Sequence, residues 1–307
     1  MIDTLIERIK ETKNPVCVGL DTNLSFLRKE DFSGDDTNPL RYAGENIWRF
    51  NKSLIDELCD IIPSVKVQVA YYEMYGFYGM EAYYKTLEYA KEKGLVTIAD
   101  VKRNDIGATA SAYSAAYLGK TDVCGNTVGA FGADFATVNG YLGSDGVLPF
   151  VEDCKKHNKG IFMLVKTSNK SSGELQDMVC DGKTVYEHMA DMTEKWGAEL
   201  VGKYGYSDIG AVVGATYPKQ AEKLRADHKN MFFLIPGYGA QGATAQDIMP
   251  NFDKKGLGGV VNSSRGILAA YKKEKYAGMT PTKAARAATL DMQKDILTTF
   301  EKNEIDF

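Results

Sequence analysis

The feature of this chain that most restricts its fold is a series of eight short apolar runs, each followed by a turn and a helix-like segment. Parallel strands are covered on both faces and therefore read as nearly continuous Val, Ile and Leu. Alternation of such strands with helices indicates a parallel α/β sheet, and eight units match a (β/α)8 TIM barrel. The runs lie near residues 16–21, 65–70, 96–102, 135–140, 161–168, 209–216, 232–239 and 258–266.

We expect a single-domain barrel that spans residues 1–307, because no Pro-, Gly- or Ser-rich linker interrupts the series. The longer connections at 22–48 and 170–207 are interpreted as excursions from this barrel. An open, doubly wound sheet is the alternative, but no G-x-G-x-x-G follows the first run. Two helix starts are marked by proline at the first helical position, Asn38-Pro39 and Thr280-Pro281.

Composition excludes several classes of function. A formal net charge of −4, with interspersed acids and lysines, argues against sequence-independent nucleic-acid binding. No apolar run approaches the length of a membrane span, and the amphipathic N-terminus lacks the continuous apolar stretch of a signal peptide. The cysteines are odd in number and form no C-x-x-C, which is typical of reduced thiols in the cytoplasm; they are Cys17, Cys59, Cys124, Cys154 and Cys180.

The third run ends in a charged pattern, Asp-x-Lys-x-x-Asp, within TIADVKRNDIGATA at 97–110. Side chains alternate along a strand, so Asp100 and Lys102 are predicted to share a face, about 7 Å apart along the backbone. Asp105 falls beyond the strand, where the chain turns into a helix. Ligands of parallel α/β proteins bind at the carboxyl ends of strands. Alone, the pattern indicates either a catalytic array or a structural ion pair.

Other predicted strand ends also carry polar side chains. Lys66 lies inside VKVQVA, where a lysine is costly unless it faces a polar site; an edge strand or a misplaced strand is the alternative. No histidine falls at a strand end, so we expect neither a His-based metal site nor a Ser-His-Asp triad. The strand-end set consists of Asp21, Lys66, Asp100, Lys102, Thr167, Ser168, Gln241 and Arg265.

Two glycine-containing segments follow the last two strands, PGYGAQG at 236–242 and NSSRGI at 262–267. Glycines let backbone N–H groups approach an anion, and a helix N-terminus favours negative charge. In barrels, the loops after strands 7 and 8 frequently form a phosphate site. Arg265 can bind phosphate through its planar fork, and Gln241 can donate from its loop. We therefore expect a phosphorylated substrate.

Taken together, the motifs resemble those of orotidine 5′-phosphate decarboxylase in its longer bacterial form, over nearly the whole chain. The chain differs from the usual pattern at Gly140 and Lys170, where the family usually has proline; neither position is assigned to catalysis. The motifs that carry the resemblance are VGLD at 18–21, K-x-Q-x-A at 66–70, ADVKRNDIGATA at 99–110, ADFATVNGYLG at 133–143, VKTSN at 165–169, VVGATYP at 212–218, PGYGAQG and NSSRG.

The resemblance implies conversion of orotidine 5′-phosphate (OMP) to UMP and CO₂, the last step of de novo pyrimidine synthesis, with no cofactor and no metal. Lys102 is then the proton donor to C6, and Lys66, Asp100 and Asp105 complete the charged array. Residues that match Asp105 and Thr109 reach into the neighbouring subunit's site in this family. The resemblance thus implies an obligate homodimer with two shared active sites.

The same resemblance implies a set of substrate contacts. Asp21 and Lys66 would bind ribose hydroxyls, and Ser168 would bind the pyrimidine. Gln241 and Arg265 would hold the phosphate.

Two other interpretations compete with this one. Sugar-phosphate lyases such as 3-keto-L-gulonate 6-phosphate decarboxylase share the barrel and the D-x-K-x-x-D motif but use Mg²⁺ bound by a carboxylate on strand 2. This chain has Lys66 there, which would repel a divalent cation. The second is a catalytically silent nucleotide-binding protein, for which the loss of a charged residue would be the signature. All four charged residues are present.

Overall fold

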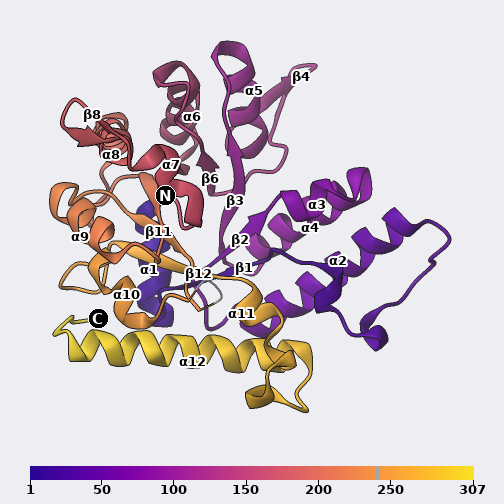
Figure 1. Cartoon of the computed structure of the whole chain (residues 1–307). Coiled ribbons are helices and arrows are strands. Elements are labelled where there is room, and N and C mark those ends of the chain that lie inside the picture. Colours follow the sequence, from indigo (N-terminus) through magenta and orange to yellow (C-terminus); the bar gives the residue numbers. More distant parts are fainter. Residues whose placement is uncertain (240–241) are drawn as a thin grey trace.

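The computed structural model describes residues 1–239 and 242–307, and parallel strands form a closed barrel at its centre (Figure 1). The strand order is β1-β12-β11-β10-β7-β6-β3-β2, so the predicted single-domain eight-stranded barrel is confirmed. All pairings between neighbouring barrel strands are parallel. The strands are β1 Val16–Gly19, β2 Ser64–Gln68, β3 Val96–Arg103, β6 Phe135–Val138, β7 Gly160–Lys166, β10 Ile209–Val213, β11 Phe233–Pro236 and β12 Gly259–Ser263.

Helices surround the barrel, and both predicted proline starts are confirmed. The Asn38 side chain accepts a hydrogen bond from the N–H of Arg41, and that of Thr280 accepts from Lys283, which caps each helix. The last helix, α12, packs along α10, α11 and α2 (Figure 1). The helices are α1 Ile2–Thr12, α2 Pro39–Leu58, α3 Ala70–Glu73, α4 Gly76–Glu92, α5 Gly107–Tyr117, α6 Ser144–His157, α7 Gly173–Gln176, α8 Val185–Gly197, α9 Pro218–Asp227, α10 Ala245–Ile248, α11 Arg265–Leu268 and α12 Pro281–Lys302.

Helix α1 closes the amino-terminal end of the barrel. Its apolar residues Ile2, Leu5, Ile6 and Ile9 are buried and pack against side chains of the barrel interior, including three phenylalanines. Asp208, just before β10, accepts a hydrogen bond of 2.6 Å from the N–H of Ile2. With this end filled, the carboxyl ends of the strands are the place where a ligand can enter.

Two small antiparallel hairpins interrupt the strand–helix alternation, and the sequence analysis did not anticipate either. One joins β4 Thr121–Val123 to β5 Asn126–Val128; the other joins β8 Val179–Cys180 to β9 Lys183–Thr184. The second hairpin lies in the predicted 170–207 excursion. No helix in the described ranges is both long and apolar enough to span a membrane. Short 3₁₀ helices occur at Leu24–Phe26, Lys29–Asp31, Lys170–Ser172, Ala198–Leu200, Met249–Asn251, Ala270–Lys272 and Glu274–Tyr276.

The packing of α1 predicts that substitutions on its two faces differ greatly in their effect on the free energy of unfolding. Leu5 is fully buried against the barrel interior, so Leu5→Ala should lower the free energy of unfolding by about 2–5 kcal/mol. Thr4 is exposed one residue away, and Thr4→Ala should change it by no more than about 0.5 kcal/mol. Denaturant titration of both variants measures the difference. Equal stabilities would show that α1 does not close the barrel.

Candidate active site

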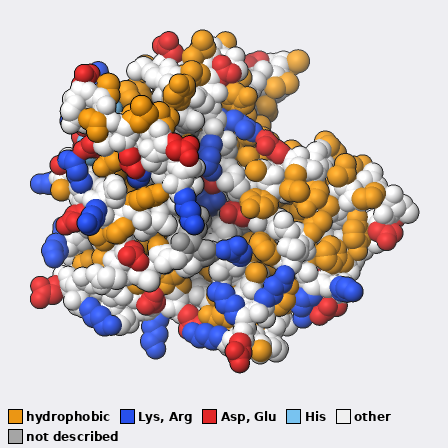
Figure 2. Space-filling view, in the orientation of Figure 1, with side chains coloured by type: hydrophobic (Ala, Val, Ile, Leu, Met, Phe, Trp, Pro, Cys, Tyr) orange, Lys and Arg blue, Asp and Glu red, His pale blue; other side chains and the backbone are white. Residues whose placement is uncertain are grey.

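A cleft of about 610 Å³ opens at the carboxyl ends of the barrel strands. Figure 2 shows Lys, Arg, Asp and Glu side chains gathered around this hollow. Every barrel strand, or the turn that follows it, contributes to the lining. Of the predicted residues, the cleft brings together Asp21, Lys66, Asp100, Lys102, Thr167, Ser168 and Arg265.

Asp100 is the centre of the polar network in this cleft. Its Oδ2 accepts from Lys66 Nζ at 2.8 Å and from Gln68 Nε2 at 2.9 Å. Its Oδ1 accepts from Lys102 Nζ at 2.5 Å and from Thr137 Oγ1 at 2.9 Å. The four donors come from β2, β3 and β6, which are neighbours in the barrel. A carboxylate that is only 6% exposed is thus fully supplied with donors.

The charges in this network fix the ionisation of its buried members. Burial alone would lower the pKa of Lys66, but the attraction of Asp100 and Asp21 outweighs it and raises that pKa above its usual range. Burial alone would raise the pKa of Asp100, but Lys66 and Lys102 outweigh it and hold that pKa well below its usual range. Both groups therefore carry their charge at neutral pH.

Lys102 departs from the regular strand geometry that the alternation of side chains predicts. Its φ of +47° is left-handed, and the pairing of β3 with β6 shifts register between Ala99 and Arg103. The hydroxyl of Thr137 accepts from the N–H groups of both Val101 and Lys102, at 2.9 Å each, while it donates to Asp100. One buried hydroxyl thus supports the strained backbone and orients the carboxylate.

The sequence analysis did not single out Gln68 or Thr137 as site residues. Gln68 lies two positions after Lys66, so strand alternation places both on the cleft side. Thr137 is a lone hydroxyl in an apolar run, which is the signal that marks it. Its partners on β3 follow from strand pairing that the sequence does not reveal.

Asp21 is held at the edge of the cleft by a buried network behind it. The Tyr72 hydroxyl donates to the carbonyl of Leu20 at 2.9 Å, and Asn51 donates to that hydroxyl. Thr22 donates to Asn51 at 2.6 Å. Because both neighbours of Asp21 are fixed in this way, its carboxylate stays within 3.1 Å of Lys66 Nζ.

The opposite wall of the cleft carries neutral polar groups and one arginine. Arg265 begins α11, and Ser168 and Asn169 follow β7. Asn262 and Ser264 also line the cleft; their Oδ1 and Oγ atoms are buried, lie beside Gly19 and have no hydrogen-bond partner within the described ranges. The sequence analysis named neither of these two residues. Gln241, predicted to contact phosphate, lies outside the described residues.

Asp105 and Thr109 do not line the cleft of their own chain. Asp105 accepts a hydrogen bond of 2.8 Å from the N–H of Ile106, and Thr109 is exposed on α5. The predicted third member of the D-x-K-x-x-D array is therefore separated from the other two within one chain.

The cleft is poorly suited to a divalent cation. Asp21 and Asp100 are its carboxylates, and both are bound by Lys66, so a cation would have to displace an ammonium group. Across residues 1–239 and 242–307, no group of three or more His, Cys, Asp or Glu side chains is arranged to hold a metal.

Comparison with known proteins gives consistent matches. Residues 14–279 match the model of the orotidine 5′-phosphate decarboxylase / HUMPS family. The orotidine 5′-phosphate decarboxylase of Clostridium acetobutylicum is 42% identical over 300 residues, covering 97% of this chain and 99% of the relative. That of Caldicellulosiruptor saccharolyticus is 42% identical over 275 residues, covering 88% and 90%. The structure of Leishmania donovani OMP decarboxylase is 26% identical, with a TM-score of 0.74 and 98% of each chain covered.

The charge network predicts that Asp100 stabilises the fold strongly. Asp100→Asn leaves the buried Lys66 with one carboxylate partner and should lower the free energy of unfolding by about 3–5 kcal/mol. Asp56 is the matched control, because its pairs with Lys52 and Lys93 lie at the surface. Asp56→Asn should lower it by about 1 kcal/mol or less.

Denaturant titration at several pH values measures both effects. The pKa of Asp100 lies below that of an unfolded aspartate, about 3.9, so its stabilisation is complete above that pH and is lost as the pH falls further. Equal effects of the two variants at neutral pH would contradict the central role of Asp100.

Proposed function

The chain belongs to the orotidine 5′-phosphate decarboxylase / HUMPS family, and we propose that it converts OMP to UMP and CO₂ without a cofactor. The observation that carries the proposal is the placement of Asp100 between two lysine ammonium groups, Lys66 and Lys102. These charges lie in the same cleft as Arg265, which can bind a phosphate.

The chemistry of this reaction matches the charges available. Loss of CO₂ from C6 leaves an electron pair in the plane of the pyrimidine ring, where the ring cannot delocalise it. An ammonium group beside C6 stabilises that developing charge and then protonates the carbon. Lysine side chains are protonated at neutral pH. We assign this role to Lys102, whose side chain is 45% exposed to the cleft, whereas Lys66 is buried beneath it.

Asp100 contributes in a second way. Its low pKa keeps it ionised, so it repels the substrate carboxylate on C6, and departure of CO₂ relieves that repulsion. We rank this ground-state effect below transition-state stabilisation by Lys102. Because Lys66 and Lys102 neutralise much of the charge on Asp100, the repulsion is reduced in the bound complex.

Contacts away from C6 supply the binding energy. We assign the ribose hydroxyls to Asp21 and Lys66, the pyrimidine to Ser168, and the phosphate to Arg265 together with Gln241. Charge-assisted bonds from arginine to phosphate are among the stronger polar contacts in proteins. Such remote binding energy can offset the repulsion between Asp100 and the substrate carboxylate.

We also propose a homodimer in which Asp105 and Thr109 complete the partner's site. Both lie outside their own cleft, on the rim formed by the ends of β2, β3 and β6. Large apolar side chains on the same rim are exposed, and Figure 2 shows hydrophobic side chains gathered over α3 and α4. Such a patch is typical of a protein interface. Met74 and Phe77, beside α3 and in α4, are 61% and 76% exposed, and Ile106 and Tyr141, after β3 and β6, are 54% and 75% exposed.

The proposal predicts decarboxylation of OMP by the purified protein in excess EDTA. The absorbance change from OMP to UMP measures the rate. Lys102→Ala should lower kcat by about 100- to 10,000-fold, because it removes the proton donor. Lys170, an exposed lysine outside the cleft, provides the control, and Lys170→Ala should retain the wild-type rate.

Other outcomes would contradict the proposal in different ways. Turnover that EDTA abolishes would indicate the magnesium-dependent chemistry of the sugar-phosphate lyases. Substantial turnover by folded Lys102→Ala would refute its role as proton donor. Tight UMP binding without decarboxylation by the wild type would indicate a binding protein.

The shared site predicts complementation between two inactive variants. A mixed dimer of Lys102→Ala and Asp105→Ala has one site with both residues intact. Random mixing of equal amounts should restore about a quarter of wild-type activity, because half of the dimers are mixed and each has one working site. Absence of recovery in verified mixed dimers would exclude a site shared in this way.

A further inference from the structure

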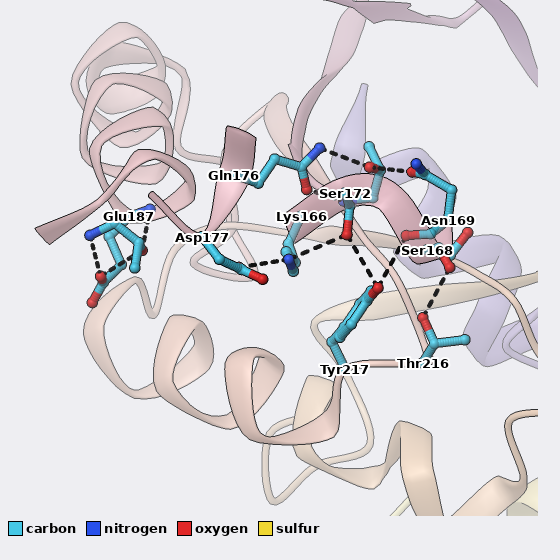
Figure 3. A network of polar contacts seen from close by, with 11 residues as sticks. Lys166, Ser168, Asn169, Ser172, Gln176, Asp177, Glu187, Thr216 and Tyr217 are labelled. Atoms are coloured by element: carbon cyan, nitrogen blue, oxygen red, sulfur yellow. Dashed lines mark hydrogen bonds and ion pairs between the residues drawn. The ribbon is translucent and has the colours of Figure 1, made fainter. Parts of the chain in front are cut away.

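Two backbone carbonyls beside the cleft are held by hydroxyl groups from the loop between β10 and α9 (Figure 3). Thr216 Oγ1 donates to the carbonyl of Ser168 at 3.1 Å, and Tyr217 Oη donates to that of Asn169 at 3.0 Å. Ser168 and Asn169 line the cleft, whereas Thr216 and Tyr217 do not. Val212 of the motif VVGATYP lines the cleft directly, whereas Thr216 and Tyr217 contact it only through Ser168 and Asn169, and the proposed chemistry gives these two hydroxyls no other role.

A chain of hydrogen bonds extends this contact back to a buried charge. Lys166 Nζ donates to Ser172 Oγ at 3.2 Å, and Ser172 donates to Tyr217 Oη at 3.1 Å, which donates in turn to Asn169. An ammonium group can only donate, so Lys166 fixes the direction of every bond in the series. Bonds that run in one direction polarise and strengthen one another.

The surroundings of Lys166 keep this chain in place. Its side chain is fully buried and lies 4.4 Å from the centre of the Tyr217 ring, a favourable cation–π distance. Its counter-ion Asp177, at 2.7 Å, follows α7 and joins the far end of the 168–177 segment to the barrel (Figure 3). At Gly214, an added Cβ would meet Ser168 Cα at 2.7 Å, so the two segments are in direct contact.

We propose that Tyr217, with Thr216 and Lys166, positions Ser168 and Asn169 against the pyrimidine base of the substrate. The assignment rests on the proposed function, because it takes the base to lie beside Ser168. Tyr217 acts through the carbonyl of Asn169, and Thr216 through that of Ser168; neither side chain touches the reacting atoms. Its contribution is therefore specific to ligands that carry a base.

Tyr217→Phe tests the proposal, because it removes the hydroxyl and keeps the ring beside Lys166. We expect KM for OMP to rise about five- to tenfold, as one well-formed hydrogen bond is lost. The affinity for UMP should fall by the same factor, whereas the affinity for ribose 5-phosphate should not change. A phosphate-binding defect or a general loosening of the fold would weaken both ligands together.

Two further variants keep the test decisive. Thr216→Val removes the neighbouring hydroxyl and should reproduce the selective loss of UMP affinity. Tyr206→Phe is the matched control, since this buried tyrosine donates to Asp253 at the opposite end of the barrel and should leave both affinities unchanged.

The possible results distinguish a failure of the positioning role from a failure of the proposed function. Equal weakening of UMP and ribose 5-phosphate by Tyr217→Phe, or no change in either, would overturn the positioning role. A wild type that neither binds UMP nor decarboxylates OMP would overturn the proposed function itself.

Discussion

The buried carboxylate of Asp100 is the interaction on which the rest of the site depends. A charge removed from water is tolerated only when donors surround it, and Asp100 has four, from three adjacent strands. The same contacts hold Lys66 and Lys102 at fixed positions relative to one another. The donors come from β2, β3 and β6, which pair with one another in the barrel. Any change in this strand pairing would therefore also change the geometry of the charges.

Within the described barrel strands, backbone strain occurs at the residue proposed to transfer the proton. Lys102 is the one left-handed residue within the described barrel strands, and the pairing of β3 with β6 is irregular beside it. Thr137 compensates by accepting both N–H groups that the irregularity leaves without strand partners. The irregularity lies directly beside the contact of 2.5 Å between Lys102 Nζ and Asp100.

The sequence predicted the barrel well because parallel strands and amphipathic helices have strong signals. The eight apolar runs, the proline starts of α2 and α12, and the apolar face of α1 all follow from local patterns. The two hairpins were missed because their strands are two or three residues long and largely exposed. Thr137 and Gln68 were missed because their importance depends on which strands are neighbours, and the sequence of one strand does not contain that information. At Gly140, an added Cβ would come within 2.6 Å of Met189 Sδ, a contact between distant parts of the chain that the local sequence does not reveal.

The two walls of the cleft contribute differently to substrate binding, and the reason is electrostatic. On the wall of β2, β3 and β6, the charged groups satisfy one another, so they are in place before any ligand arrives. The same wall repels a substrate carboxylate through Asp100, and binding must therefore be favourable elsewhere. The opposite wall supplies Arg265, Ser168 and Asn169, which offer a cation and neutral polar groups to the ligand. Lys166 lies behind that wall and fixes it through Ser172 and Tyr217. A buried charge therefore orders each half of the site, Asp100 on one side and Lys166 on the other.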